Sequence, residues 1–283
     1  MNNLLIATDF SVTASNAAAY GVQLARAMNA RVILFSACEH LPMPISELPV
    51  DIEPEVLNKY TQDQLEEDAR VLTAIHQTPV STCCYSGTSL QALLQAIQEQ
   101  QADMVIAGIH GGAANNRRWW GSTVTSWIGK ISVPMIVVPE NCSFSYITKI
   151  TLATEVDLSN GDAGDSVRLL RELGERFHAQ LDLVRVLDDS GDLHSSLSEL
   201  PEQLMSYTRA LSPRYACITG TDVAAALSRY IERNQVSLLA VMPHHHHFLY
   251  KIFKHSESKR LAAVSTVPLL VLPPDNPPHT IHR

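Results

Sequence analysis

The feature that most constrains the fold of this 283-residue chain is an internal repeat. Residues 105–139 align without gaps to residues 239–273 at a constant offset, so that Gly108 matches Met242 and Pro134 matches Pro268. Both segments end in an apolar run bracketed by prolines. A repeat at fixed offset indicates duplication of one folding unit rather than two unrelated domains. We therefore expect two consecutive copies of the same domain.

Within each half, segments with strand character alternate with segments of helical apolar spacing. Strands that alternate with helices form a parallel sheet covered on both faces, because each crossover is a right-handed helical connection. The predicted fold is α/β, with two tandem, Rossmann-like, doubly wound parallel sheets of five strands each. The first half is expected to contain strands at 4–8, 31–37, 80–85, 103–107 and 135–138 and helices at 13–28, 55–76, around 90–97, and at 122–131. The second half repeats this order, with strands at 150–154, 180–187, 215–219, 237–242 and 269–272 and helices at 159–178, near 198–211, and at 223–234 and 256–264.

The chain length also favours two domains, because single hydrophobic cores rarely grow beyond about 250–300 residues. We place one domain at 1–140 and the other at 147–275, with a flexible Pro-rich tail at 276–283. The polar linker 140–146 is short. Such a connection holds the halves close together, so we expect an intramolecular pseudo-dimer rather than two independent domains.

Composition and charge exclude several classes of function. The chain is 46% hydrophobic and 18% charged, which is typical of a packed globular protein. Its net charge of −8 and its scattered basic residues disfavour a nucleic-acid partner. Apolar runs such as 264–274 fall short of the ~20 residues of a membrane-spanning helix, and the chain opens on a strand rather than a signal peptide. We expect a cytoplasmic protein with no membrane partner.

The five cysteines are odd in number and form no C-x-x-C pair, which argues against a disulfide framework or a cysteine zinc site. We interpret them as small apolar thiols in a reducing compartment. The adjacent Cys83 and Cys84 are expected to point to opposite faces of one strand, with one of them buried.

The most specific motif is Gly108-Ile109-His110-Gly111, followed nine residues later by Gly121-Ser122-Thr123. A predicted strand precedes it and a predicted helix follows. Glycines at a strand end allow close approach of a ligand to the backbone. The N–H groups, hydroxyls and dipole of the following helix N-terminus favour phosphate. The motif therefore predicts an anion-binding loop.

This G-x2-G-x9-G-S pattern resembles the ATP-binding motif of the universal stress protein family. The opening residues 5–11, which include Asp9, and Gly87 before the third helix are also similar to that family. The resemblance implies a fold like that of the adenine nucleotide alpha hydrolases, with strand order 3-2-1-4-5. In that order Asp9 and Gly108 would lie at the topological switch point, where open α/β sheets bind ligands. It further implies a pseudo-dimer that pairs through the fifth strands, with further homo-oligomerisation left open.

The resemblance also assigns roles to individual residues. Asp9 would hold the ribose hydroxyls or a phosphate-bound Mg²⁺. Ala7, Thr8, Ala37 and Ala107 would border the adenosine. The phosphates of ATP would be held by Gly108, Gly111, Gly121, Ser122 and Thr123. One departure is the pair Trp119-Trp120 next to Arg117-Arg118, whose indoles could stack on the ligand, pack on the other half or occlude the site.

The second half lacks this motif. Gly108, Gly111 and Gly121 are replaced by Met242, His245 and His255, and Asp9 by Glu155. We expect this domain to be degenerate and to act as a structural partner. Its loop 244–247 is a run of four histidines, of which His244 and His246, together with His255, are candidate ligands for Zn²⁺ or Ni²⁺. The alternative is a surface loop that binds metal only adventitiously.

The resulting hypothesis is a stress-response regulatory protein that binds ATP or a related adenine nucleotide and turns it over slowly at most. One alternative is a weak Mg²⁺-dependent ATP hydrolase that uses Asp9 with Arg117. Another is an interaction module that binds no nucleotide. The chain has neither a P-loop motif nor a G-x-S-x-G hydrolase motif, so those enzyme classes are not expected.

Overall fold

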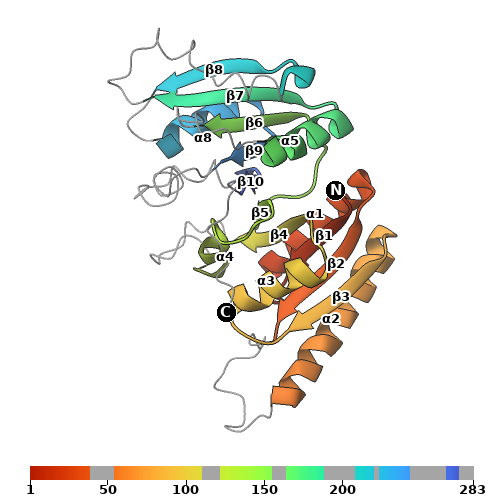
Figure 1. Cartoon of the computed structure of the whole chain (residues 1–283). Helices are drawn as coiled ribbons and strands as arrows, with labels where there is room; N and C mark the ends of the chain where they lie inside the picture. The colour runs from red at the N-terminus through yellow and green to blue at the C-terminus, as the bar shows by residue number, and fades with distance from the viewer. Residues whose placement is uncertain are drawn as a thin grey trace. The chain divides into compact units, whose positions relative to one another are not determined.

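The computed structural model describes residues 1–38, 54–109, 122–154, 164–187, 208–219, 223–242 and 266–273. The chain divides into two compact units, one formed by most of Met1–Phe144 and the other by Ser145–Arg283 together with short segments such as Gly129–Pro134. Each unit contains a parallel sheet with helices packed against it (Figure 1). Within the described ranges, no helix combines the length and hydropathy needed to cross a bilayer.

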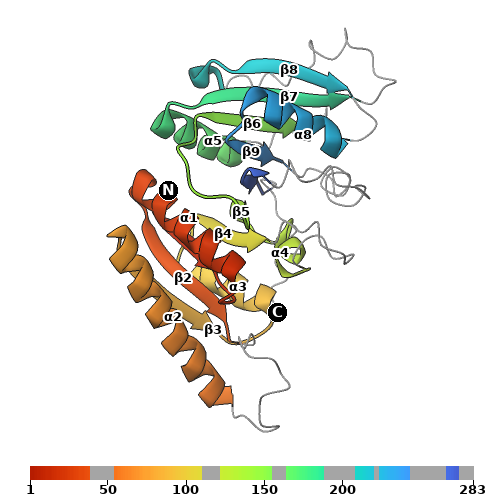
Figure 2. The same ribbon diagram turned by 180° about the vertical axis from the view of Figure 1, so that it is seen from behind.

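The first unit has the strand order β3-β2-β1-β4-β5, all parallel, which confirms the predicted order 3-2-1-4-5. Helices α1 and α2 cover one face of this sheet and α3 and α4 the other (Figures 1 and 2). The strands are β1 Asn3–Ala7, β2 Arg31–Ala37, β3 Val80–Tyr85, β4 Met104–Ile109 and β5 Met135–Pro139. The helices are α1 Val12–Met28, α2 Pro54–His76, α3 Ser89–Glu99 and α4 Ser122–Trp127.

The centre of this unit is the contact between β1 and α1. Strand β1 is a continuous apolar run because helices cover both of its faces, and Leu4, Leu5 and Ile6 are completely buried. A Cβ added to Gly21 of α1 would lie 2.7 Å from Cδ1 of Ile6, so glycine is what allows the helix to approach the strand this closely. This contact fixes where the start of α1 lies relative to the end of β1.

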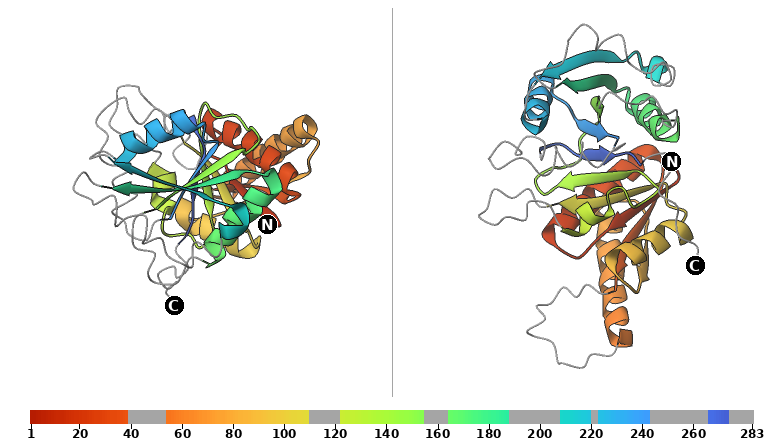
Figure 3. Two further views of the ribbon diagram at one scale, coloured as in Figure 1. Left: turned by 90° about the horizontal axis from the view of Figure 1, so that it is seen from above. Right: turned by 60° about the vertical axis from the view of Figure 1, so that its left-hand side comes forward.

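The second unit has the strand order β10-β9-β6-β7-β8, again all parallel. Counted from its own first strand, this is the same 3-2-1-4-5 order read from the opposite edge. Its helices α5 and α8 lie on opposite faces of the sheet (Figures 1 and 2), and further views show the successive rotation of its strands (Figure 3). The elements are β6 Lys149–Thr154, α5 Gly164–Phe177, β7 Gln180–Leu187, the 3₁₀ turn η2 Arg209–Leu211, β8 Arg214–Thr219, α8 Val223–Asn234, β9 Leu238–Val241 and β10 Leu269–Val271.

The 134-residue offset found in the sequence extends further than the motif region. Strand β8 begins 134 residues after β3 begins, and α8 begins 134 residues after α3 begins. Each side chain in this part of the second unit therefore has a defined counterpart in the first. This equivalence allows the two copies to be compared residue by residue.

One predicted helix ends earlier in the structure than expected, and two others lie largely or wholly outside the described residues. Helix α4 ends at Trp127 rather than near residue 131, since the chain then enters a turn in which Gly129 has φ +74°. Of the helix expected near 198–211, the described residues include only a short helical end that contains η2, because 198–207 lie outside them. The helix expected at 256–264 also lies outside the described residues.

The segment that follows β5 packs on the first unit. The side-chain amide of Asn16 in α1 donates hydrogen bonds to the carbonyls of Pro139 and Cys142, at 3.1 and 3.0 Å. Phe144 then makes an edge-on contact with Tyr20, with ring centroids 5.3 Å apart. Burial, with a smaller contribution from Cys142, raises the pKa of the Tyr20 phenol well above its usual value. These contacts pack part of the expected linker against the first unit.

The prediction that the cysteines are all free thiols is wrong for one pair, because Cys38 and Cys84 form a disulfide. Ser36 of β2 is in register with Cys84 of β3, and the chain just beyond β2 stays bonded to β3 through Cys38 N–H and the Tyr85 carbonyl. The two Cα atoms are 6.2 Å apart, within the usual range for a disulfide. The cysteines are 46 residues apart in sequence, so only the strand pairing shows that they meet.

This disulfide predicts a thiol count. Unreduced protein unfolded in guanidinium should titrate three thiols per chain, from Cys83, Cys142 and Cys217, and five after reduction. Reduction should lower the free energy of unfolding by about 2–4 kcal/mol, since the bond closes a long loop. The variant Cys217→Ser should give two thiols before reduction and four after, whereas Cys38→Ser should give four in both cases. Five thiols in unreduced wild-type protein would contradict the pairing.

Candidate functional site

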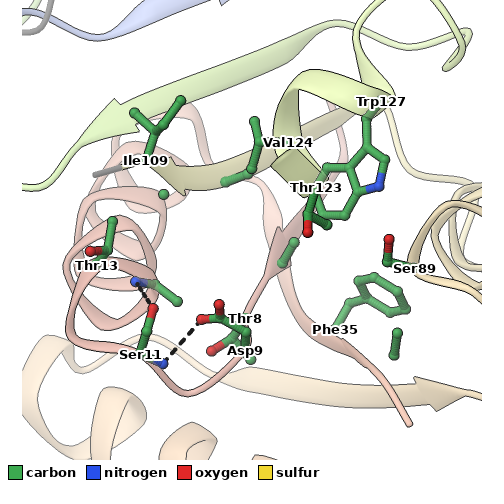
Figure 4. Close-up of a pocket in the computed structure, with 15 residues that line it drawn as sticks. Thr8, Asp9, Ser11, Thr13, Phe35, Ser89, Ile109, Thr123, Val124 and Trp127 are labelled. Atoms are coloured by element: carbon green, nitrogen blue, oxygen red, sulfur yellow. Dashed lines mark hydrogen bonds between the residues drawn. The ribbon is translucent and has the colours of Figure 1, made fainter. Parts of the chain in front are cut away.

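The first unit has a cavity of about 150 Å³ at the carboxyl ends of its central strands. It opens where β1 and β4 are adjacent while the helices that follow them, α1 and α4, cover opposite faces. This is the topological switch point at which doubly wound sheets bind ligands. Figure 4 shows the residues around it. They are Ala7, Thr8, Asp9, Ser11, Thr13, Ala14, Phe35, Ala37, Ser89, Ala107, Gly108, Ile109, Thr123, Val124 and Trp127.

Seven of the ten residues that the sequence assigned to a nucleotide site line this one cavity. They are Ala7, Thr8, Asp9, Ala37, Ala107, Gly108 and Thr123. Ser122 is the first residue of α4, beside Thr123. Gly111 and Gly121 lie outside the described residues, as do the arginine and tryptophan pairs between them.

The loop from β1 to α1 places a carboxylate at the cavity. Asp9 is exposed, and its Oδ1 accepts a hydrogen bond from Ser11 N–H at 3.1 Å, while Oδ2 makes none within the described part of the chain. Thr8 is buried and its hydroxyl accepts from Phe10 N–H at 3.0 Å, in a loop where Phe10 adopts a left-handed φ of +63°. A tight turn of this kind holds one carboxylate oxygen in place and leaves the other available to a ligand.

Two helix N-termini also contribute to the wall. Helix α1 begins after the N-cap Ser11, whose hydroxyl accepts from Ala14 N–H at 3.1 Å. Helix α3 begins at Ser89, after a capping box formed by Thr88 and Gln91. Both ends direct the positive pole of a helix dipole toward the region of the cavity. The sequence prediction missed Ser11 and Ser89, although the T-x-x-Q pattern could have indicated where α3 starts.

The opposite side of the cavity is aromatic. In Figure 4, Phe35, Ser89 and Trp127 lie on one side, Ser11 and Thr13 on the other, with Thr8 and Asp9 between them. Trp127 is only 5% exposed, and its indole N–H is buried without a hydrogen-bond partner in the described structure. An unpaired buried donor is unfavourable by about 1–3 kcal/mol. Because this N–H has essentially no accessible surface, it is the apolar part of the indole that lines the cavity. The sequence prediction considered only the tryptophans at 119 and 120 and missed this one.

Gly108 has a packing reason to be glycine, in addition to the one the motif suggested. A Cβ at this position would lie 2.5 Å from the carbonyl oxygen of Thr13, in the first turn of α1. The missing side chain therefore allows close packing of β4 against α1. Gly108 also lines the cavity. The glycine shapes the site by positioning the start of α1.

The second unit differs at the matched position. Met242, the counterpart of Gly108, is buried directly after β9, so that a side chain occupies the place where the first unit has bare backbone. The metal candidates His244, His246 and His255 lie outside the described residues, as does Glu155. Within the described ranges, no three His, Cys, Asp or Glu side chains come close enough together to hold a metal ion.

The fold and the position of the cavity define a doubly wound α/β protein with a cavity at its switch point. Residues 1–139 match the model of the universal stress protein family. The chain thus belongs to the universal stress protein family through its amino-terminal half. No curated protein sequence shows significant similarity to it.

Solved structures agree with this assignment of the fold. A universal stress protein from Archaeoglobus fulgidus is similar over 96% of this chain and 98% of its own, with 15% sequence identity and a TM-score of 0.71. A putative universal stress protein from Pseudomonas aeruginosa is similar over 97% and 94%, with 14% identity and a TM-score of 0.51. At this level of identity the similarity shows the fold alone.

Proposed function

We propose that the first unit binds ATP or a related adenine nucleotide in the cavity between β1 and β4, as part of a stress-response regulatory role. The observation that carries this proposal is the convergence of seven motif-assigned residues on one cavity at the switch point of a universal stress protein unit. Open α/β sheets bind ligands at this position. The composition of the walls then suggests how the ligand lies.

The aromatic and apolar side of the cavity suits a base. Phe35, Ala37 and Trp127 offer aromatic and apolar contacts. A flat, largely apolar ring matches these contacts. We therefore place the adenine on this side.

The polar side suits the sugar and the phosphates. The free Oδ2 of Asp9 can accept from ribose hydroxyls or bind a phosphate-bound Mg²⁺. Thr123 and Ser122 at the start of α4, with Gly111 and Gly121 of the motif, are proposed to contact the phosphates. The start of α1 at Ser11 adds the positive end of a longer helix dipole.

We further propose that the second unit is a degenerate copy that serves as the intramolecular partner of the first through the fifth strands. Its buried Met242 supports the loss of a family-type nucleotide site. The domain limits 1–140 and 147–275 belong to this proposal. Binding of Zn²⁺ or Ni²⁺ at the histidines is a separate hypothesis, which metal analysis of the purified protein tests.

The nucleotide proposal is tested by calorimetric titration of the full chain with AMP and Mg-ATP. Replacing Asp9 with Asn should weaken AMP binding by roughly 10–100-fold, because a charged hydrogen-bond acceptor is lost. The matched control is Asp63→Ala, an acidic residue of α2 away from the cavity. Absence of saturable binding by wild-type protein at millimolar nucleotide would overturn the proposal.

The same titration can separate the two roles of Asp9. If Asp9 binds the ribose, the Asp9 substitution should weaken binding of a 2′,3′-dideoxy nucleotide only slightly. The dideoxy ligand already lacks the hydroxyls that would donate to Asp9, so the variant removes no further hydrogen bond. If Asp9 binds Mg²⁺, wild-type protein should bind Mg-ATP more tightly than it binds metal-free ATP in the presence of a chelator. The variant should then bind both forms with the same affinity.

A further inference from the structure

The second unit has a groove of its own, far in sequence from any motif residue. It has a volume of about 400 Å³ and lies between β8 and α8. This volume falls within the range of small-molecule sites. Its described lining includes Ile218 and Thr219 at the end of β8 and, on α8, Arg229, Tyr230 and Arg233.

The groove carries two unbalanced positive charges. Arg229 and Arg233 are exposed and lie one helical turn apart, so both extend from the same face of α8. Neither guanidinium makes a hydrogen bond or an ion pair within the described residues. Like charges at this spacing destabilise a helix. The favourable effect of a cation on the C-terminal dipole accounts for Arg233 in the last turn but not for Arg229 in the helix interior.

A nearby acid does not neutralise these arginines, because it is already paired. The carboxylate of Asp182 is completely buried and accepts two hydrogen bonds from Arg214, at 2.9 and 3.0 Å. Its Oδ2 also accepts from the Tyr230 hydroxyl at 3.0 Å. Burial, reinforced by the bond to Asp182, raises the pKa of this phenol to about 12, so it remains a neutral donor. Arg229 and Arg233 are therefore left for a ligand from outside.

At the matched place in the first unit the side chains bond to one another, which makes the difference specific. There Tyr85 lies at the position of Thr219, and its hydroxyl donates to Glu99 at 2.9 Å and accepts from Gln100 at 3.0 Å. Gln95 also donates to Glu99, at 2.9 Å. These side chains bind one another across β3 and α3 and leave no unpaired cation.

Three replacements convert this set of bonded side chains into the groove of the second unit. Tyr85 corresponds to Thr219, Gln95 to Arg229 and Glu99 to Arg233. The first replacement removes an aromatic ring, and the other two exchange an acid and an amide for two cations. The end of the strand has thus lost bulk, and the facing helix has gained positive charge, at one place.

We propose that the groove between β8 and α8 binds a small organic phosphate. The two guanidinium groups match the charge of about −1.5 to −2 that a phosphate monoester carries at pH 7, and their planar donors suit its oxygens. The hydroxyl of Thr219 lies at one end. Ile218, Ala226 and the ring of Tyr230 offer apolar contact to the organic part. This site is independent of the proposed nucleotide site.

The test is calorimetric titration of the full chain with phenyl phosphate and, separately, with inorganic phosphate. Wild-type protein should bind phenyl phosphate saturably and more tightly than inorganic phosphate. The double variant Arg229→Gln, Arg233→Glu, which restores the residues of the first unit, should weaken binding tenfold or more. Thr219→Tyr, which refills the groove without changing its charge, should weaken it comparably. The matched control Arg209→Gln alters an exposed arginine of η2 outside the groove and should leave binding unchanged.

Three results would overturn the proposal. The first is the absence of saturable binding in wild-type protein, and the second is equal affinity in the wild type and the double variant. The third is tighter binding of citrate than of phenyl phosphate, which would assign the groove to carboxylates. Because all the substituted side chains are exposed, a circular dichroism spectrum identical to that of the wild type is expected and confirms that each variant is folded.

Discussion

Replacing Ala37 with Leu should abolish the stabilisation of this protein by nucleotide. Ala37 is the last residue of β2, is 6% exposed and lines the cavity beside Phe35 and Asp9. A larger side chain would fill much of a space of about 150 Å³. Mg-ATP at one hundred times its Kd should stabilise wild-type protein by about 2.7 kcal/mol, whereas the variant should show no shift in Tm at that concentration.

The unliganded variant provides the internal control for this experiment. A leucine that fills a void should change the free energy of unfolding in denaturant by no more than about 1–2 kcal/mol. Val12→Leu adds bulk at a position that is 78% exposed beside the same loop, and should leave the Mg-ATP shift intact. A normal nucleotide shift in Ala37→Leu would show that the ligand binds elsewhere.

The second large effect is expected from Arg214→Met in the second unit. Among the described residues, the Arg214 guanidinium makes two of the three hydrogen bonds that the buried Asp182 carboxylate accepts. Removing it leaves a buried charge whose one remaining partner in this part of the chain is the Tyr230 hydroxyl. We expect the free energy of unfolding to fall by about 3 kcal/mol at pH 7, measured by urea denaturation.

A double-mutant cycle shows whether the buried charge is the cause. In an Asp182→Asn background the same Arg214→Met change should cost much less, because no carboxylate remains to be neutralised. Arg209→Met, at an exposed arginine of η2, should stay within about 0.5 kcal/mol of wild type. An equal loss with and without the Asp182 carboxylate would mean that Arg214 stabilises the unit by packing of its side chain alone.

The two units show how the same fold can be stabilised by different means. Asp182 and Arg214 are paired in register across β7 and β8, where the first unit pairs Val32 with Val80 across β2 and β3. The first unit thus uses an apolar contact where the second uses an ion pair. A buried ion pair is weak evidence of net stabilisation, but removing one partner lowers the free energy of unfolding strongly because the other charge is left buried and unpaired. This explains why we expect a large effect from a residue that is half exposed.

The order and type of the elements were determined by the sequence, because alternating apolar runs and helical spacing depend only on neighbours along the chain. The predicted ranges of β2, β3 and α8 match the structure to the residue. The internal offset likewise indicated the duplication, and the order 3-2-1-4-5 came from the family resemblance. The motif residues predicted from the sequence form much of one wall of the cavity. Asp9 follows one strand and Gly108 lies near the end of another, and the apolar pattern identifies both strands.

Contacts between residues far apart in sequence were decided only by the tertiary structure. The Cys38–Cys84 disulfide depends on the register of β2 with β3, and Trp127 reaches the cavity because α4 packs against β4 and α3. The role of Gly108 depends on the carbonyl of Thr13 in a different element. The cationic groove exists because α8 packs against β8, which brings Thr219 and Arg229 into one lining. Local sequence patterns do not specify which distant side chains a strand or helix contacts, so these features become visible only in the folded chain.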